Sequence, residues 1–323
     1  MEKYILNITD LIAKYHKEIN KGLEGIYPQG PQSLTRPVHY VLNGGGKRLR
    51  PLLTIITAEA CGGKKEDIFS AALAVEVLHN FTLVHDDIMD QDHIRHGQKT
   101  VHHKWDDGIA ILTGDAMLSL ALDLLNQSMF ERQHLMSIFI EGLLTVCEGQ
   151  ALDKEFETQT SISISDYLHM IDLKTGHMIG LAAEIGTVSA CVDEETRSSI
   201  RDYGRLLGRA FQIQDDYLEI FSDSNKMGKS LHSDIILGKK TYLMILALEE
   251  NSKIIKDAIL TSQDDFETGM KEIRKYIKNS GIQQKTLNEI SNIIELANRK
   301  LSQLKIEKDK LLYFSEWVKT RGN

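Results

Sequence analysis

Apolar residues recur every three to four positions along most of this 323-residue chain, which is the spacing of one buried helix face. The first run covers residues 5–23 and ends at the turn-forming residues 27–31. The same periodicity predicts further helices over residues 54–59, 68–85, 110–129, 135–156, 167 onward, 195–221, 241–250, 266–277 and 286–318. Clean strand alternation is rare, and all four prolines lie at or before Pro51, so we predict an all-α protein.

Two local features qualify this pattern. Ser165 with Asp166 is suited to cap the helix that follows, and Gly176 inside that helix indicates a break or a close approach of another element. No linker or repeat divides the chain convincingly. We therefore predict a single domain over residues 1–323.

Two stretches, residues 83–90 and 211–219, place paired carboxylates after an apolar run. In a helix, Asp86 and Asp90 lie one turn apart on one face, and so do Asp215 and Glu219. Acids on a helix face are often simply solvated. Because like charges at this spacing repel and the arrangement occurs twice, we favour a bound cation, and Mg²⁺ is suited to carboxylates shared with substrate phosphates.

A glycine-rich run, residues 44–46, is followed by Lys47, Arg48 and Arg50. Glycine lets the backbone approach a ligand closely, and these cations suit phosphate oxygens. The alternative is a flexible loop with solvated cations, and the spacing of a Walker loop is absent. His79 falls on nearly the same helix face as Asp86, although a hydrogen-bonded core histidine is the simpler interpretation.

Charge and composition exclude several classes of function. The formal charge of −8 and the absence of a basic tract argue against nucleic-acid binding. The three cysteines have neither metal-site nor disulfide spacing. We see no signal peptide and no apolar run long enough for an integral membrane segment, so we expect a cytoplasmic protein. Three features together suit a substrate with a diphosphate and a hydrocarbon tail. They are acids that bind Mg²⁺, an apolar cavity between helices, and lysines such as Lys174, Lys229 and Lys239.

The ordered motifs between about Gly44 and Leu248 resemble those of the trans-isoprenyl diphosphate synthases, or polyprenyl synthetases, which include farnesyl and geranylgeranyl diphosphate synthases. The resemblance implies a helical bundle around a central cavity, the isoprenoid synthase fold. It assigns metal binding, with three Mg²⁺ ions, to Asp86, Asp87, Asp90, Asp215, Asp216 and Glu219. It assigns the binding of isopentenyl diphosphate to Lys47, Arg50, His79 and His96. It assigns the binding of the allylic diphosphate to Arg95, Lys174, Thr175, Gln212, Lys229 and Lys239.

By the same resemblance, isopentenyl diphosphate condenses head-to-tail with an allylic diphosphate in a homodimeric enzyme. Asp86, Asp90, Lys174 and Asp215 would carry catalysis. Two departures from the family pattern are His96, where an arginine is usual, and Glu219, where an aspartate is usual. Phe81, five positions before the first motif, would form the pocket floor, which favours a C20 product with C15 and C25 as alternatives.

Other protein classes share some of these sequence features. A class I terpene cyclase or a squalene-synthase-like enzyme also uses two acidic helices and Mg²⁺, but needs no basic pocket for a second diphosphate. A non-catalytic regulatory subunit would be expected to lose acids that this chain keeps. A di-iron bundle needs Glu-x-x-His pairs on facing helices, and only Glu76 with His79 fits.

Overall fold

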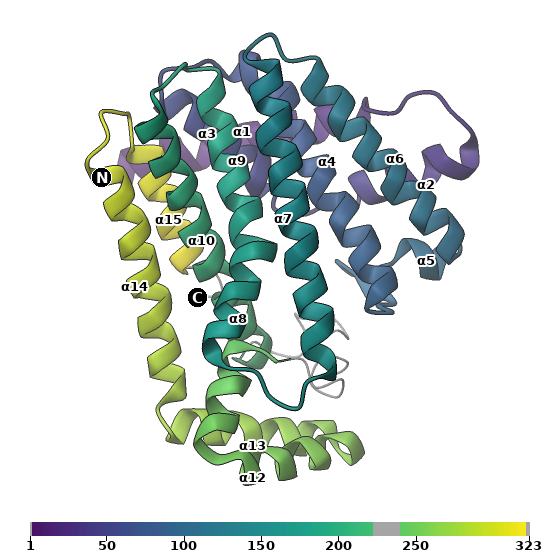
Figure 1. The fold of residues 1–323 in the computed structure, drawn as a ribbon, viewed down its shortest axis with the longest axis vertical. Coiled ribbons are helices and arrows are strands. Elements are labelled where there is room, and N and C mark those ends of the chain that lie inside the picture. Colours follow the sequence, from purple (N-terminus) through teal and green to yellow (C-terminus); the bar gives the residue numbers. More distant parts are fainter. Residues whose placement is uncertain (1, 222–239, 321–323) are drawn as a thin grey trace. The chain divides into compact units, whose positions relative to one another are not determined.

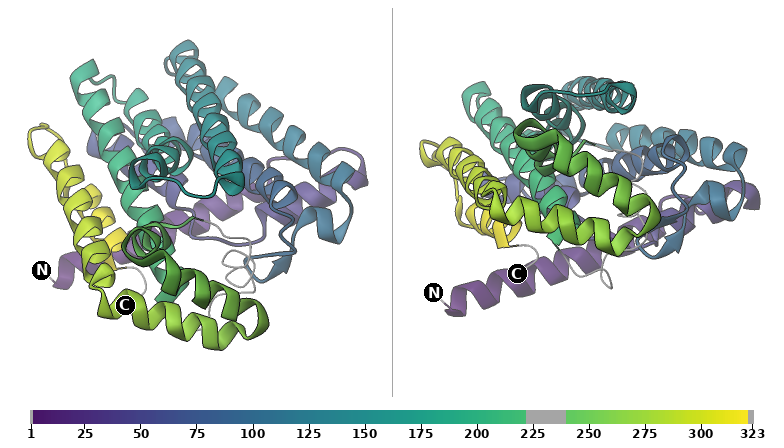
Figure 2. Two further views of the ribbon diagram at one scale, coloured as in Figure 1. Left: turned by 60° about the horizontal axis from the view of Figure 1, so that its bottom comes forward. Right: turned by 90° about the horizontal axis from the view of Figure 1, so that it is seen from below.

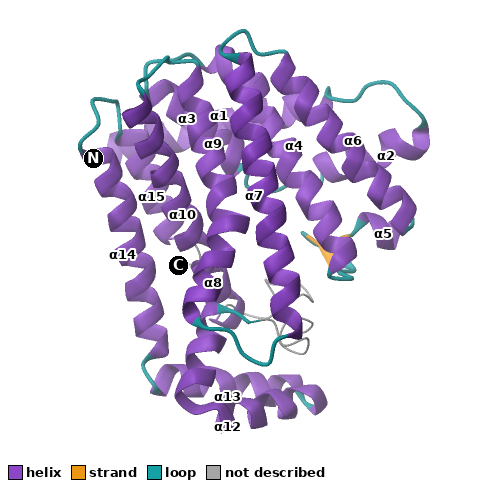
Figure 3. Ribbon diagram, viewed as in Figure 1, coloured by secondary structure: helices purple, strands orange, loops and turns teal. Residues whose placement is uncertain are grey.

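The computed structural model describes residues 2–221 and 240–320, which are helical apart from turns, loops and one two-stranded sheet (Figures 1 and 3). The chain groups into two compact units. The first is Met1–Ile140 with Leu181–Ile200 and Leu304–Leu312, and the second is Glu141–Gly180 with Arg201–Gln303 and Tyr313–Asn323. The predicted all-α class is confirmed, and the single domain stays a prediction.

In the first unit, α4 is the central helix and packs against both α3 and α6. Its wide apolar face is almost entirely buried, as the sequence pattern requires. Helix α2 was not predicted because it contains Pro37, which cannot donate a helical hydrogen bond. The elements up to residue 126 are α1 (Glu2–Glu24), α2 (Gln32–Leu42), α3 (Leu49–Ala60), α4 (Lys65–Met89), β1 (Ile94–Arg95), β2 (Gln98–Lys99), α5 (Val101–Lys104) and α6 (Asp107–Asn126).

The later elements correct two predicted boundaries. The helix expected to end near residue 250 continues to Asp264 through a kink at Asn251, and the helix expected over 286–318 is in fact two helices. Helices α12 and α13 lie side by side (Figure 2). The elements are α7 (Arg132–Thr158), α8 (Ile164–Ile171), the π-helical turn η1 (Asp172–Gly176), α9 (His177–Val188), α10 (Glu194–Phe221), α12 (Tyr242–Asp264), α13 (Phe266–Asn279), α14 (Ile282–Ser302) and α15 (Asp309–Thr320).

The predicted irregularity at Gly176 is confirmed. Residue 176 ends the π-helical turn, and a Cβ atom added to Gly208 on α10 would lie 2.7 Å from the Gly176 Cα. The two backbones therefore meet directly. The cap of α8 is Ser163 rather than Ser165: its Oγ accepts the Asp166 N–H at 3.1 Å, and the Asp166 side chain accepts the Ser163 N–H.

In the part of the chain that the structure describes, three helices, α4, α6 and α7, are long and apolar enough to cross a membrane by length and composition alone. The expectation that the chain has no membrane segment is therefore not confirmed by helix composition. In α4, 67% of the apolar window is buried inside the protein, compared with 33% in α6 and 39% in α7. The apolar character of α4 is thus largely explained by the core that it forms.

Candidate active site

The first acidic motif forms the C-terminal end of α4. Asp86 and Asp87 lie in the final turns, and Asp90 caps the helix, donating its N–H to the Asp86 carbonyl at 2.8 Å. A helix C-terminus carries negative partial charge, and α4 has no basic residue in its last turn. The helix end therefore disfavours these carboxylates. A cation bound to the partly exposed Asp86 and Asp90 would relieve that repulsion.

Asp87 differs from the other two acids because its side chain is only 6% exposed. Its Oδ1 accepts a hydrogen bond from Arg95 Nε at 2.5 Å, and Arg95 Nη2 also reaches Asp92 Oδ2 at 3.4 Å. Burial raises the pKa of Asp87 to about 6, although Arg95 acts in the opposite sense. Asp87 and Asp92 thus fix the guanidinium of Arg95 beside the motif.

Arg95 and His96 belong to a tight hairpin directly after the motif (Figure 3). Arg95 pairs with Gln98, so His96 and Gly97 form a two-residue turn in which both have positive φ, at +50° and +76°. Histidine is among the residues that tolerate this conformation. A small cavity of about 50 Å³ is lined by Arg95, His96, Asp87 and the first glycine of the basic loop, Gly44.

The predicted isopentenyl-site residues come together in the first unit. Burial lowers the pKa of His79 well below its ordinary value, and the positive charges of Arg50, Arg95 and His96 lower it further. The pKa of His96 is also lowered, first by burial and then by neighbouring cations that include Arg95 and Lys47. Arg95 acts on both imidazoles, whereas Arg50 acts on His79 and Lys47 acts on His96, so these cations create one positive field around the two histidines. Such a field favours a diphosphate and keeps both imidazoles neutral in its absence.

The second acidic motif lies on α10, and Asp216 is its buried member, 4% exposed. Its Oδ2 accepts from the Tyr167 hydroxyl at 2.5 Å and from the Tyr242 N–H at 2.8 Å, and its Oδ1 accepts from Gln212 Nε2 at 3.2 Å. Burial raises the pKa of Asp216 to about 6. Asp215 and Glu219 are partly exposed. In both motifs, the second acid is the buried one and is held by protein donors.

Two predicted residues for the allylic diphosphate adjoin the second motif through the π-helical turn. The Thr175 hydroxyl donates to Gln212 Oε1 at 3.0 Å, which links the turn to Asp216. Lys174 Nζ lies 2.8 Å from Asp153 Oδ2. Lys229 and Lys239 lie outside the described residues.

The donor set suits Mg²⁺. Among residues 2–221 and 240–320, no group of three or more His, Cys, Asp or Glu side chains is placed to hold a metal ion. Mg²⁺ does not need such a group, because it usually binds one or two carboxylates and completes its shell with water and substrate phosphates. Asp86 and Asp90 offer two hard oxygen donors one turn apart, where the helix dipole is least favourable to them.

Comparison with known proteins decides the family. The profile described as polyprenyl synthetase matches residues 31–277. The chain belongs to the polyprenyl synthetase family. It is 37% identical over 254 residues to geranylgeranyl diphosphate synthase of Methanosarcina mazei (77% of this chain and 78% of that protein). It is 34% identical over 264 residues to geranylfarnesyl diphosphate synthase of Natronomonas pharaonis (76% and 77%).

A solved polyprenyl synthetase shares the fold over nearly the whole chain. The crystal structure of geranylgeranyl pyrophosphate synthetase from Pyrococcus horikoshii superposes with a TM-score of 0.90 at 30% identity, covering 99% of both chains. The predicted family and isoprenoid synthase fold are thereby confirmed.

Phe81, which the family resemblance makes the pocket floor, lies on α4 and is 9% exposed. Its ring packs edge-on against His85, with centroids 4.8 Å apart. His85 in turn fills the space beside Gly114 of α6, where an added Cβ atom would lie 2.1 Å from its Nε2. Phe81 is therefore part of a packed aromatic cluster that precedes the first acidic motif on α4. Its role as a chain-length residue stays a prediction.

Several residues that shape these sites were not selected from the sequence. Tyr167 and Tyr242 hold Asp216, and Asp153 pairs with Lys174. Asp172 is 3% exposed and is bound by two arginines of α10. A lone buried tyrosine or aspartate carries no local motif, so only the tertiary fold shows these contacts.

Proposed function

We propose that this chain is a Mg²⁺-dependent prenyltransferase that condenses isopentenyl diphosphate with an allylic diphosphate into a short-chain all-trans prenyl diphosphate. The observation that supports it is the positive field of Lys47, Arg50 and Arg95 around two neutral histidines, next to the helix end that carries the first acidic motif. Relatives named geranylgeranyl and geranylfarnesyl diphosphate synthases support a product of C20, with C25 next and C15 as the remaining alternative.

The allylic diphosphate would be held through metal ions by both acidic motifs. We assign direct metal binding chiefly to Asp86, Asp90 and Asp215, with Glu219 through its longer side chain. The buried second acids, Asp87 and Asp216, would contribute mainly by orienting their neighbours, and three Mg²⁺ ions are expected. Bound Mg²⁺ would stabilise the charge that develops on the departing diphosphate.

Side chains of this protein would hold the allylic diphosphate for ionisation. Lys174, Thr175, Lys229 and Lys239 would contact its oxygens, and Gln212 would link Thr175 to the second motif. The allylic C–O bond would break and release diphosphate, and the double bond of isopentenyl diphosphate would form a bond to the allylic carbon. The released diphosphate would then accept the proton that the new chain loses. Positioning and electrostatics carry this reaction, because no covalent enzyme intermediate is needed.

The basic cluster would hold the second substrate. Lys47 and Arg50 supply positive charge, whereas neutral His79 and His96 supply N–H donors without adding charge. Arg95, fixed by Asp87, follows the first motif in the chain, directly before His96, and would face the allylic diphosphate. A class I terpene cyclase, the alternative function, has no second diphosphate to bind and does not account for this cluster.

A two-substrate assay tests the proposal. Purified protein with Mg²⁺ should incorporate labelled isopentenyl diphosphate into a longer prenyl diphosphate only when an allylic diphosphate is also present. Lys47→Ala should raise the KM for isopentenyl diphosphate by about tenfold, because one charge-assisted contact is lost. Lys64→Ala, an exposed lysine at the other end of α4, is the matched control. A hydrocarbon formed from the allylic diphosphate alone would support the cyclase instead.

We also propose that the enzyme is a cytoplasmic homodimer. On α6, Ile111 and Leu112 are 48% and 55% exposed, and on α7 Leu144 is 60% exposed. These apolar faces need a cover, and a second copy suits them better than lipid does. Near the middle of α6, Asp115 is exposed, and a carboxylate at the centre of a bilayer costs roughly 3 kcal/mol. Light scattering should give twice the chain mass without detergent.

A further inference from the structure

The three cations of the glycine-rich segment are not equivalent. Lys47 is exposed and Arg50 partly exposed, whereas Arg48 is 3% exposed. Arg48 also has a left-handed backbone conformation, with φ of +48°, which is uncommon for a residue with a side chain. A buried guanidinium on a strained backbone persists only where its surroundings hold it. Arg48 is therefore built into the protein and is not placed for a ligand.

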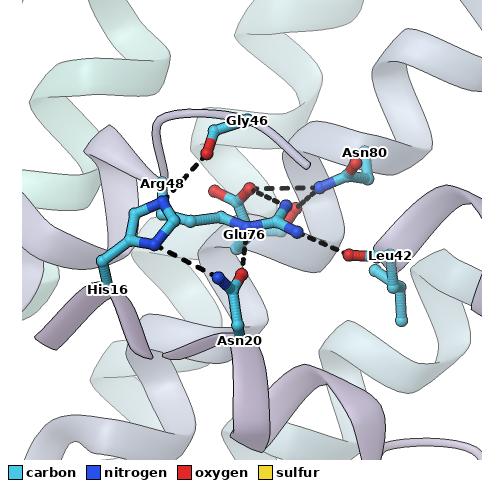
Figure 4. Close-up of polar contacts among 7 residues, drawn as sticks. All are labelled: His16, Asn20, Leu42, Gly46, Arg48, Glu76 and Asn80. Carbon is cyan, nitrogen blue, oxygen red and sulfur yellow. Dashed lines mark hydrogen bonds and ion pairs between the residues drawn. The ribbon is translucent and has the colours of Figure 1, made fainter. Parts of the chain in front are cut away.

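All three nitrogens of the Arg48 guanidinium are engaged by protein oxygens (Figure 4). Nη1 donates to Glu76 Oε1 at 2.8 Å, and Nη2 donates to the Leu42 carbonyl at 2.5 Å. Nε donates to Asn20 Oδ1 at 2.9 Å. These partners lie on α4, α2 and α1, so one side chain ties the loop to three helices.

A second contact from α1 holds the residue on the other side of Lys47. His16 Nε2 lies 3.0 Å from the Gly46 carbonyl, and Asn20 Nδ2 lies 3.1 Å from His16 Nδ1. Because Asn20 presents its oxygen to Arg48, its amide nitrogen faces His16, and His16 must then donate through Nε2. The chain of hydrogen bonds from Gly46 to Arg48 thus fixes the backbone on both sides of Lys47 (Figure 4).

The same arginine connects the loop to the helix of the acidic motif. Glu76 lies three residues before His79 on α4, and its side chain is 5% exposed. Asn80, on the next turn of α4, donates to Glu76 Oε1 at 3.3 Å and lines the small cavity with Arg95 and His96. A buried ion pair is weak support for stability but can specify register between elements.

We propose that Asn20 and His16 of α1, with Arg48 and Glu76, are positioning residues that hold Lys47 and Arg50 for isopentenyl diphosphate. They act without touching the substrate, and this inference rests on the proposed function. Helix α1 (Glu2–Glu24) precedes the residues matched by the family profile, which begin at 31. The structure thus assigns a role in substrate binding to a helix outside that matched region.

The test is Asn20→Ala, measured by KM for each substrate and by calorimetric titration with isopentenyl diphosphate. We expect the KM and Kd for isopentenyl diphosphate to rise about tenfold, since a hydrogen bond to a charged group is lost. The KM for the allylic diphosphate should rise much less. Asn20→Asp, which keeps an oxygen facing Arg48, should recover most of the affinity. Lys17→Ala, at an exposed position of α1, is the control.

The outcomes separate this inference from the proposed function. Equal losses for both substrates, or an unchanged Kd, would overturn the positioning role and leave the enzyme assignment intact. A wild-type protein that binds isopentenyl diphosphate but does not elongate would contradict the proposed function, while weaker binding by Asn20→Ala would still support the inference. A wild-type protein that does not bind isopentenyl diphosphate at all would overturn both.

Discussion

Two buried aspartates of the second unit, Asp216 and Asp172, should respond oppositely to the same substitution. The donors to Asp216 among the described residues are all neutral groups, and its pKa is raised from 3.8 to about 6. Burial also acts to raise the pKa of Asp172, but Arg209 and Arg205 outweigh it and hold that pKa below its ordinary value. The ionised form is therefore disfavoured at Asp216 and favoured at Asp172.

The direction in which stability changes with pH follows from the difference in proton binding between the folded and unfolded states. Between pH 3.8 and about 6, Asp216 binds more protons in the folded protein than in the unfolded chain. Its contribution to the free energy of unfolding therefore falls as the pH rises through this window. Above it, ionisation of Asp216 costs about 3 kcal/mol at 1.36 kcal/mol for each pKa unit. Asp216→Asn removes this charge. At roughly 2.1 cal/mol/K per residue for the entropy of unfolding, the Tm of metal-free protein should rise by about 4 °C at pH 7.5.

The hydrogen bonds at position 216 can be kept in this variant. An asparagine oxygen in place of Oδ2 still accepts from Tyr167 and Tyr242, and a flip of the Gln212 amide lets it accept from the new NH₂ group. Thermal unfolding in EDTA should show the gain at pH 7.5 and about half of it at pH 5, where the native carboxyl is largely protonated. Asp172→Asn should lower the Tm at pH 7.5. A loss of stability in both variants, or a gain in Asp216→Asn that does not change with pH, would refute the reasoning.

Three further predictions concern other parts of the site. Phe81→Ala should lengthen the product seen by chromatography, whereas Phe69→Ala, about 18 Å away along α4, should not; an unchanged profile would remove Phe81 as the determinant. Gly149→Ala should lower the Tm and the rate of elongation, because its Cβ would lie 2.5 Å from the backbone nitrogen of Lys174. A rate like that of the wild type would count against this close packing. Because the pKa of His79 is lowered in the folded protein, its contribution to stability should fall as the pH drops below about 6.5. His79→Gln should therefore lose less Tm than wild type between pH 7.5 and 5.5, and parallel losses would contradict this.

Much of the site followed from sequence because helix geometry is local. The spacing of Asp86 and Asp90 placed both on one turn, and the periodicity before them predicted the buried face of α4. The grouping of Lys47, Arg50 and His79 came from the family resemblance, and the charge of Arg50 does act on His79. Gly176 signalled an irregular turn because glycine is unfavourable inside a helix.

The rest depended on contacts distant in sequence. No feature of the neighbouring sequence distinguishes Arg48 from Lys47, yet Arg48 is buried against Glu76 and Lys47 is exposed. The hairpin after the motif has no clear signal in the sequence, since His96 with Gly97 is not among the usual turn pairs. The division of the final helix has no glycine or proline to mark it.

Mass analysis of the product tests the central claim most directly. Wild-type protein with Mg²⁺, deuterated isopentenyl diphosphate and farnesyl diphosphate should yield a C20 prenyl diphosphate that carries one labelled five-carbon unit, and Asp86→Asn should nearly abolish it. The account would be contradicted by a product without the label, or by a hydrocarbon that has lost its diphosphate.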